Sequence, residues 1–178
     1  MTVIQTLVRS CVRVTPTDPK AEYGGLVVAL AARGRLESFG GLCPDRELVE
    51  RVRLAGMGVF DAGRGVSGYI YDTVPVALSV CARHRDDFRQ AVLDVIGLGG
   101  DTDTVAAIVG GVVGARLGEG GIPGEWVDGI WYWPRSVGAM QRLAGGERVR
   151  LSYFGLFIRN WVFFVIAFWQ AVVGIVRR

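Results

Sequence analysis

The 178-residue sequence is poor in two residue types on which several functions depend. It has one lysine, Lys20, and one histidine, His84. The other basic residues are arginines scattered along the chain, and the net charge is only +3. Nucleic-acid-binding domains concentrate basic residues in a run or stripe, so we expect no nucleic-acid partner. His84 lies in the polar run 83–87, which favours a solvated turn over a catalytic position.

Cysteine is also scarce. Cys11, Cys43 and Cys81 are odd in number and far apart, which argues against a disulfide framework and against a CxxC zinc site. We expect buried, reduced thiols in a cytoplasmic protein. The N-terminal segment lacks a basic start followed by a continuous apolar stretch and a cleavage site, so we expect no secretory signal. No segment of any length alternates as a strand does, and no repeat is present.

Apolar residues are plentiful. Hydrophobic residues make up 51% of the chain and charged residues 21%, a composition that supports a packed core and argues against disorder. The length suggests one domain, or two at most. The mean hydropathy of +0.34 is high for a soluble domain, and the excess is concentrated at the C-terminus.

The apolar residues recur at helical spacing, so the sequence predicts an all-α protein. Asp18 suits an N-cap with Pro19 at the first helical position. Gly110 and Gly114 lie four apart in an apolar run too short to span a membrane, so we expect them to allow close helix packing in a soluble core. The predicted helices cover approximately residues 3–12, 19–33, 45–54, 72–82, 86–96 and 105–117.

One segment points to a functional site more strongly than any other, Gly99-Gly100-Asp101-Thr102-Asp103-Thr104. Its glycines allow a sharp turn and leave room for a ligand. Asp101, Asp103 and Thr104 offer hard oxygen ligands, which suit Mg²⁺ or Mn²⁺ better than zinc. The alternative is an acidic N-cap turn for the following helix. An EF-hand and a dinucleotide-binding loop both lack required residues here.

Two further segments accompany this motif. One is Thr15-x-Thr17-Asp18-Pro19, and the other is Gly65-Val66-Ser67-Gly68-Tyr69-Ile70-x-x-Thr73-Val74-Pro75-x-Ala77-Leu78. The motif itself continues as Val105-Ala106-Ala107-Ile108, then Gly110, Gly114 and Ile122-Pro123-x-x-Trp126. In this order, the three segments resemble the ADP-ribosylglycohydrolase family, which includes the dinitrogenase reductase-activating glycohydrolases. The resemblance extends from about residue 3 to about residue 145.

The resemblance implies an all-α, orthogonal multi-helix fold with two Mg²⁺ ions in a cleft, where Mn²⁺ can substitute. It implies hydrolysis at the ribose anomeric carbon, which removes ADP-ribose from a protein or small-molecule acceptor. The implied metal ligands are Asp101, Asp103 and Thr104. The alternative for Tyr69 is a core aromatic. The residues expected to line the ADP-ribose cleft are Gly65, Ser67, Gly68, Tyr69, Gly99 and Gly100.

The sequence departs from the family at two points. It has no Thr-Asp-Asp cluster, which in the family supplies the remaining metal ligands and the general base, so the catalytic residue is not assigned. Pro16 stands where the family usually has a histidine. We therefore expect residues 1–146 to form the C-terminal half of the family domain. Truncation, gene decay and a separate chain that completes the site are the alternative explanations for the missing half. The alternative function is an inactive ADP-ribose-binding or membrane-associated remnant.

The C-terminal segment 151–178 is strongly hydrophobic, and residues 161–176 carry no charge. A helix over 151–176 would be about 39 Å long, enough to cross a hydrocarbon core of about 30 Å with tilt. We expect a membrane anchor that holds a cytoplasmic domain at the membrane. An interfacial helix and a helix buried in protein are the alternatives.

Overall fold

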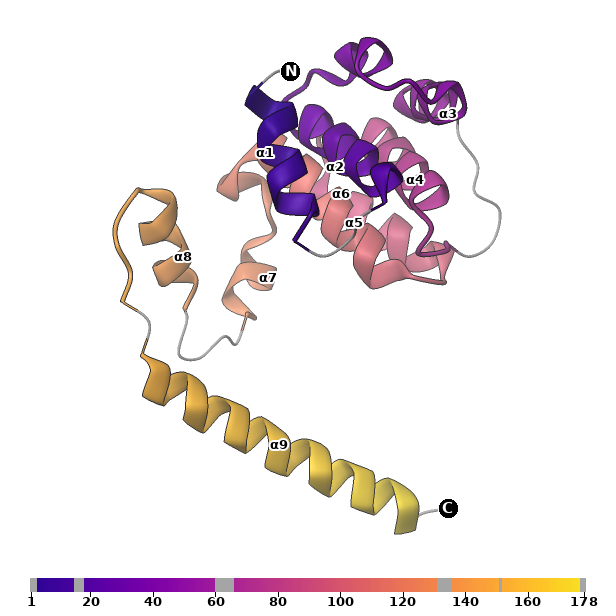
Figure 1. Ribbon diagram of the computed structural model, residues 1–178. Helices are drawn as coiled ribbons and strands as arrows, with labels where there is room; N and C mark the ends of the chain where they lie inside the picture. The colour runs from indigo at the N-terminus through magenta and orange to yellow at the C-terminus, as the bar shows by residue number, and fades with distance from the viewer. Residues whose placement is uncertain (1–2, 15–17, 60–65, 131–135, 151, 177–178) are drawn as a thin grey trace. The chain divides into compact units, whose positions relative to one another are not determined.

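The computed structural model describes residues 3–14, 18–59, 66–130, 136–150 and 152–176. These residues form helices, turns and loops without a β-strand, which confirms the predicted all-α fold (Figure 1). The elements, in chain order, are α1 (Val3–Val12), α2 (Pro19–Ala32), η1 (Leu36–Gly41), α3 (Arg46–Gly56), α4 (Ile70–Arg83), α5 (Phe88–Leu98), α6 (Thr102–Leu117), η2 (Glu119–Gly121), α7 (Gly124–Asp128), α8 (Val137–Ala144) and α9 (Tyr153–Val176).

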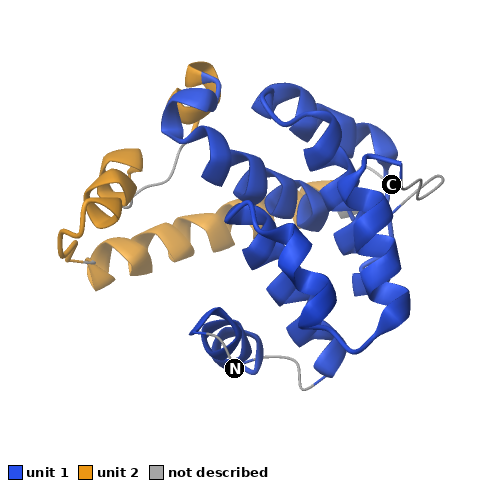
Figure 2. Cartoon of the chain, turned by 90° about the horizontal axis from the view of Figure 1, so that it is seen from above, with its two compact units in different colours: residues 1–123 blue, residues 124–178 orange. Residues whose placement is uncertain are grey.

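The chain divides into two compact units (Figure 2). Unit 1, residues 1–123, contains α1 to α6 and both 3₁₀ segments, and unit 2, residues 124–178, contains α7 to α9. The predicted boundary between a family domain ending at 146 and a tail starting at 151 remains a prediction.

Three helices begin with an aspartate whose side chain caps the first turn. The side chain of Asp18 accepts from the backbone N–H of Lys20, with Pro19 at the first helical position as predicted. Asp45 caps α3 and Asp87 caps α5 in the same way. Each cap satisfies N–H groups that the first turn of a helix leaves unpaired, which is typically worth about 1 kcal/mol.

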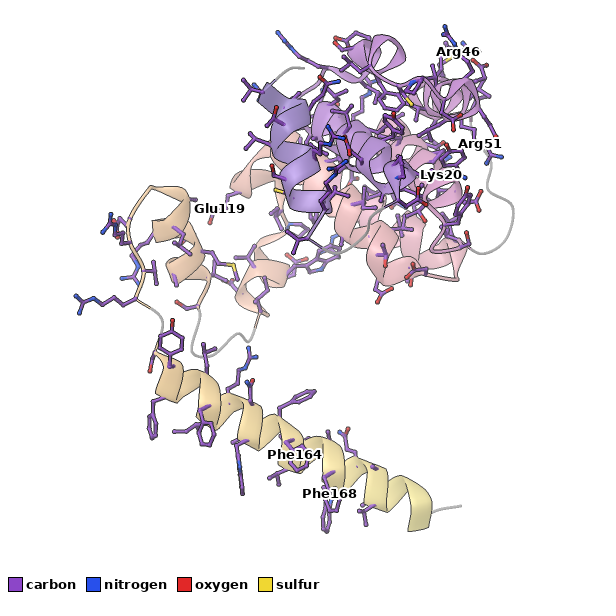
Figure 3. All side chains as sticks on the ribbon, in the orientation of Figure 1. Lys20, Arg46, Arg51, Glu119, Phe164 and Phe168 are labelled. Atoms are coloured by element: carbon purple, nitrogen blue, oxygen red, sulfur yellow. The ribbon has the colours of Figure 1, made fainter. Side chains whose placement is uncertain are left out.

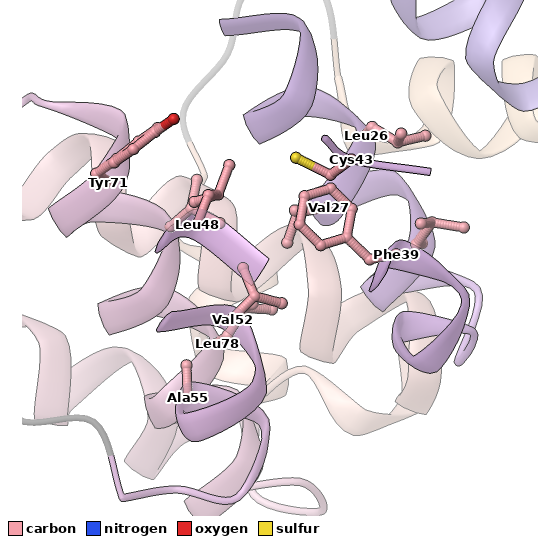
Figure 4. Close-up of a cluster of buried hydrophobic side chains, with 11 residues drawn as sticks. Leu26, Val27, Phe39, Cys43, Leu48, Val52, Ala55, Tyr71 and Leu78 are labelled. Atoms are coloured by element: carbon pink, nitrogen blue, oxygen red, sulfur yellow. The ribbon is translucent and has the colours of Figure 1, made fainter. Parts of the chain in front are cut away.

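The core of unit 1 contains two hydrophobic clusters that share α4. One cluster joins α2, η1, α3 and α4 around Phe39 and Leu48 (Figure 4). The other joins α4, α5 and α6 around Val80, Val95 and Val109. Fully burying such a side chain contributes roughly 1.5–3 kcal/mol, so α4, buried from Tyr71 to Cys81 except for Asp72, is the central helix of the unit.

Four helices, α2, α3, α4 and α6, begin at the same end of unit 1. Lys20 in the first turn of α2 donates a hydrogen bond to Tyr69, the N-cap of α4, and Tyr71 of α4 donates one to Asp45, the N-cap of α3. A parallel β-bridge joins the segments that precede α4 and α6. Residues from the far ends of all four helices line one pocket. The four helices therefore run in the same direction.

The start of α4 differs from the prediction. The helix begins at Ile70 rather than Asp72, so Pro75 lies beyond the first turn, inside the helix. Proline has no N–H to donate to the carbonyl four residues earlier, which is that of Tyr71. Arg51 of α3 donates to this carbonyl oxygen instead, at 3.3 Å. A long-range hydrogen bond thus replaces the missing local one.

The polar run 83–87 contains the expected turn between α4 and α5 and is exposed except at His84, which is half-buried with its Nε2 3.0 Å from Asp94 Oδ2. The expectation for the thiols needs correction at one position. Cys11 is exposed, whereas Cys43 and Cys81 are buried free thiols as expected. Burial raises the pKa of the Cys81 thiol to about 12, so this thiol remains protonated near neutral pH.

Gly110 and Gly114 have the packing role that the sequence predicts. Both lie beside the ring of Phe88 of α5, and a Cβ at either position would stand 3.6 or 3.5 Å from ring atoms. The pair therefore lets α5 approach α6 closely within a hydrophobic cluster.

Unit 2 ends in the long apolar helix α9, which confirms the predicted C-terminal helix. Its span Tyr153–Gly174 has a mean hydropathy of 1.7 and is long and apolar enough to cross a membrane. Large side chains are exposed along it, including Phe164 and Phe168, which stack with their ring centroids 6.4 Å apart (Figure 3).

Candidate functional site

The motif Gly99–Thr104 forms the turn from α5 into α6. Gly99 and Gly100 have positive φ angles of 73° and 83°, a region that side chains disfavour. Val66 N donates to Gly99 O at 3.1 Å, and Asp101 N donates to Val66 O at 2.9 Å. A Cβ on Gly100 would overlap the backbone of Val66. Gly100 therefore allows the two segments to meet.

Asp101 occupies the N-cap position of α6, yet its side chain makes no capping hydrogen bond. Its Oδ1 instead accepts from Thr104 Oγ1 at 2.9 Å. Asp103 Oδ1 accepts from the backbone N–H of Thr104 at 3.0 Å. Helix capping thus does not account for the Asp101 carboxylate, and oxygen atoms of all three predicted ligands lie close together.

The surroundings of Asp103 favour its ionised form over the neutral acid. Its pKa is lowered from the ordinary value, first by a hydrogen bond with Asp101 and then by backbone N–H groups of Thr104 and Asp103. Two adjacent carboxylates and a hydroxyl form the kind of oxygen set that Mg²⁺ prefers. Within the described ranges, no group of three or more His, Cys, Asp or Glu side chains could hold a metal ion. The residues therefore fit part of a Mg²⁺ coordination shell.

The loop before α4 lies against this motif. Val66 is buried and makes the β-bridge to Gly100, whereas Ser67, Gly68 and Tyr69 are exposed. A Cβ on Gly68 would stand 3.2 Å from Asp101 Oδ2. The structure thus brings these predicted substrate-binding residues beside the predicted metal ligands. Gly65 lies outside the described residues.

Buried and ionic contacts hold this loop in place. Thr73 is buried, and its Oγ1 lies 2.6 Å from Ser67 O and 3.0 Å from Tyr69 O, so its hydroxyl proton is shared between two loop carbonyls. Ser67 Oγ donates to Asp72 Oδ2 at 2.9 Å, and Arg51 Nη1 lies 3.2 Å from Asp72 Oδ1. The loop is therefore tied to both α4 and α3.

A cation and two aromatic rings adjoin the loop. Lys20 Nζ donates to the Tyr69 hydroxyl at 2.9 Å, and it lies 5.5 Å and 5.0 Å from the ring centroids of Tyr69 and Tyr71. The Tyr71 hydroxyl donates to Asp45. Burial, followed by this hydrogen bond, raises the pKa of Tyr71. Tyr69 is 47% exposed, so it is not a core aromatic.

Sequence reasoning missed Lys20, Arg51, Asp72 and Thr73. Asp72 and Thr73 directly follow the segment Ser67–Tyr71, and polar residues in the first turn of a largely buried helix were an available signal. Lys20 and Arg51 offered no local signal, because each reaches the loop through the tertiary fold.

A pocket of about 560 Å³ lies away from this site, at the C-terminal ends of α2, α3, α4 and α6. Arg33, Arg85 and Arg116 line it together with small and apolar residues. Cations at helix C-termini complement the helix dipole, which accounts for the three arginines. No residue of the motif lines this pocket.

Comparison with known proteins agrees with the motifs. The family model for ADP-ribosylglycohydrolase matches residues 2–152. ADP-ribosylarginine hydrolase Tri1 of Serratia proteamaculans (strain 568) is 40% identical over 62 residues, 35% of this chain and 17% of that protein. Tri1 of Pseudomonas putida (strain GB-1) is 39% identical over 78 residues, 44% of this chain and 20% of that protein.

A third relative is ADP-ribosylhydrolase ARH3 of Gallus gallus, 30% identical over 78 residues, which are 38% of this chain and 21% of that protein. The matched segments thus cover about a fifth of each of these relatives. No solved structure matches the chain. Since the family match covers most of the chain and includes the motif, the loop before α4 and the N-cap of α2, this protein belongs to the ADP-ribosylglycohydrolase family.

Proposed function

We propose that this chain binds ADP-ribosyl groups and forms one wall of a Mg²⁺-dependent site that hydrolyses their glycosidic bonds. The observation that carries the proposal is the contact between the Asp101–Thr104 motif and the loop Val66–Tyr69. The N-termini of α2, α4 and α6 adjoin this contact, and their partial positive charge favours an anionic ligand such as a diphosphate.

The described residues have distinct roles in this proposal. Asp101, Asp103 and Thr104 would hold Mg²⁺, and Gly99, where a Cβ would have no neighbour within 4 Å, leaves open space for the sugar. Bound Mg²⁺ orients the ribose hydroxyls and activates water. These ligands fill only part of a near-octahedral shell, so we expect the chain alone to bind Mg²⁺ weakly and to turn over no substrate.

Binding of free ADP-ribose by the full chain tests this proposal. We expect Mg²⁺ to increase ADP-ribose binding by the full chain, and Asp101→Ala with Asp103→Ala to abolish that increase. The measurement is calorimetric titration with ADP-ribose at several Mg²⁺ concentrations. Absence of ADP-ribose binding at any Mg²⁺ concentration would refute the proposal.

A second candidate function is an ADP-ribose-binding protein without catalysis. It is favoured by the lack, within the described residues, of a third acidic or histidine side chain beside Asp101 and Asp103. An assay for release of free ADP-ribose from ADP-ribosyl-arginine, the substrate class for which two relatives are named, separates the two functions. Metal-dependent release of free ADP-ribose that disappears in Asp103→Ala would establish hydrolysis by the chain itself and contradict our expectation of an incomplete site.

We also propose that α9 anchors a cytoplasmic site to a membrane. A helix of 24 residues is about 36 Å long, which exceeds the hydrocarbon thickness of about 30 Å. Arg148 and Arg150 precede the helix, and arginines 177 and 178 follow it. The substrates would be ADP-ribosylated proteins or small molecules that reach the membrane surface, and a separate chain could supply the remaining metal ligands.

A further inference from the structure

Lys20 is placed to bind an anion. It is the only lysine of the chain, lies in the first turn of α2 and is half-buried. Within the described residues it forms no ion pair, and its hydrogen-bond partner is the neutral hydroxyl of Tyr69. Figure 3 labels it together with Arg51 of the same unit. Arg51 is already paired with Glu47 at 2.9 Å and Asp72 at 3.2 Å, so its charge is compensated.

The nearby carboxylates are occupied elsewhere. Asp18 caps α2, and Asp45 caps α3 and accepts from the Tyr71 hydroxyl. The pKa of Lys20 is raised, first by the hydrogen bond to Tyr69, so the ammonium group stays charged across the neutral range. The Tyr69 and Tyr71 rings beneath it stand 5.4 Å apart. Lys20 thus lies beside two aromatic rings and makes no ion pair within the described residues, although Asp18 and Asp45 contribute to its raised pKa through their charge.

The position of Lys20 connects it to the metal motif. Tyr69, its hydrogen-bond partner, directly follows Gly68, and Gly68 lies against the Asp101 carboxylate. Lys20 and the predicted metal ligands therefore flank the same four-residue loop, Val66–Tyr69. A ligand that has its ribose at Asp101 and its phosphates along this loop would place those phosphates beside the Lys20 cation.

We propose that Lys20 contacts the diphosphate of the bound ADP-ribosyl group and makes the site prefer diphosphate-bearing ligands over nucleosides. This proposal rests on the proposed function, because it assumes that ADP-ribose binds at the loop. Lys20 supplies a charge-assisted hydrogen bond and Coulomb attraction, whereas Tyr69 holds the ammonium group in position. A bond of this kind is stronger than one between neutral groups.

The test uses the full chain in detergent micelles with Mg²⁺, titrated calorimetrically with ADP-ribose and, separately, with adenosine. Lys20→Gln should weaken ADP-ribose binding roughly tenfold or more, the loss typical of a hydrogen bond to a charged group. Lys20→Arg keeps the charge and should retain most of the affinity. The matched control is Arg46→Gln, which removes an exposed cation at the start of α3 and should leave the affinity for both ligands unchanged.

Salt provides an independent readout. Raising the ionic strength should weaken ADP-ribose binding more in the wild type than in Lys20→Gln, because the variant lacks the screened charge. A variant that merely disturbed the loop would lose affinity for adenosine too and keep the wild-type salt dependence. Equal affinities of wild type and Lys20→Gln for ADP-ribose would overturn the role of Lys20 while the proposed function stands. If the wild type bound no ADP-ribose, both proposals would fail.

Discussion

At the scale of single residues, both the backbone conformation and the close packing at position 100 require glycine. Its φ of 83° costs a side chain about 1–2 kcal/mol, and a Cβ would also overlap the Val66 backbone. We expect Gly100→Ala to lower the free energy of unfolding by more than this conformational cost, because the β-bridge must open. Denaturant unfolding monitored by circular dichroism measures the change.

Gly111 provides the control for that substitution. It lies on α6, and a Cβ there would have no neighbour within 4 Å. Gly111→Ala should stabilise the helix by about 0.5–1 kcal/mol, since alanine is the better helix former. A Gly100→Ala protein as stable as the wild type would mean that the bridge does not constrain the motif.

Asp94 makes the stability depend on pH. Its partial burial favours the neutral acid, but hydrogen bonds and charges from Arg83 and His84 outweigh that effect and lower its pKa below the ordinary 3.8. A lowered pKa stabilises the folded state above the unfolded pKa, and the contribution disappears as pH falls through the folded pKa. We therefore expect the stability of the wild type to fall below about pH 4.

Asp94→Asn removes this titration. The variant should be less stable than the wild type near neutral pH and should lose less stability between about pH 5 and pH 3. The reference is Asp86→Asn, because Asp86 is 78% exposed and contacts only Arg116 among the described ion pairs. Urea denaturation at several pH values gives the curves. Parallel curves for wild type and Asp94→Asn would show that Asp94 is not responsible.

Residues whose role depends on near neighbours could be predicted from the sequence. Asp18, Asp45 and Asp87 cap their helices through bonds that reach two or three residues along the chain. The bond from Lys20 to Tyr69 crosses 49 positions, and no local pattern encodes it. The sequence suggested a metal site at Asp101–Thr104 because the oxygen donors of this segment lie within four residues.

At the scale of helices, α4 depends on α3. Arg51 donates to Tyr71 O, to which Pro75 cannot donate, and it also pairs with Asp72. We expect Arg51→Met to destabilise the protein by about 1–3 kcal/mol, the range for a lost hydrogen bond to a charged group. In a Pro75→Ala background the restored N–H can donate to Tyr71 O. Arg51→Met should then lower the free energy of unfolding by about 1 kcal/mol less than it does in the wild type.

A double-mutant cycle by denaturant unfolding measures this coupling. Arg53→Gln is the matched control, because Arg53 lies on α3 but pairs with Glu50 on the exposed side of the same helix. Arg53→Gln should lower the free energy of unfolding by no more than about 1 kcal/mol, as for other surface ion pairs. Additive effects of Arg51→Met and Pro75→Ala would show that Arg51 does not compensate for the proline.

The helices themselves were easier to predict than their ends. The apolar spacing located α1 to α6 because each buries one face or more against the two clusters of unit 1. The start of α4 was placed two residues late because Pro75 suggests a first turn. The actual start depends on Thr73 and Arg51, whose partners lie in the loop and on a neighbouring helix.

At the scale of the whole molecule, the composition separates two kinds of helix. Unit 1 has a buried hydrophobic core, whereas α9 carries exposed aromatic side chains such as Trp161, Phe163 and Trp169, at 62%, 71% and 68%. Exposed apolar area of this extent marks an interaction surface. Sequence alone could predict the helix and its length, but not what covers it, because a lipid and a protein partner both favour the same side chains.

Substituting the centre of α9 distinguishes these environments. An arginine at the middle of a membrane-spanning helix costs about 2.5–3.5 kcal/mol on insertion scales. We expect the full chain to sediment with membranes and to resist carbonate extraction, Ala167→Arg to reduce that fraction markedly, and the control Ala167→Leu to preserve it. A chain ending at Arg150 should remain soluble. If the full chain stays in the soluble fraction and the truncated chain aggregates, α9 packs on protein instead, because its removal would then expose an apolar surface that it normally covers.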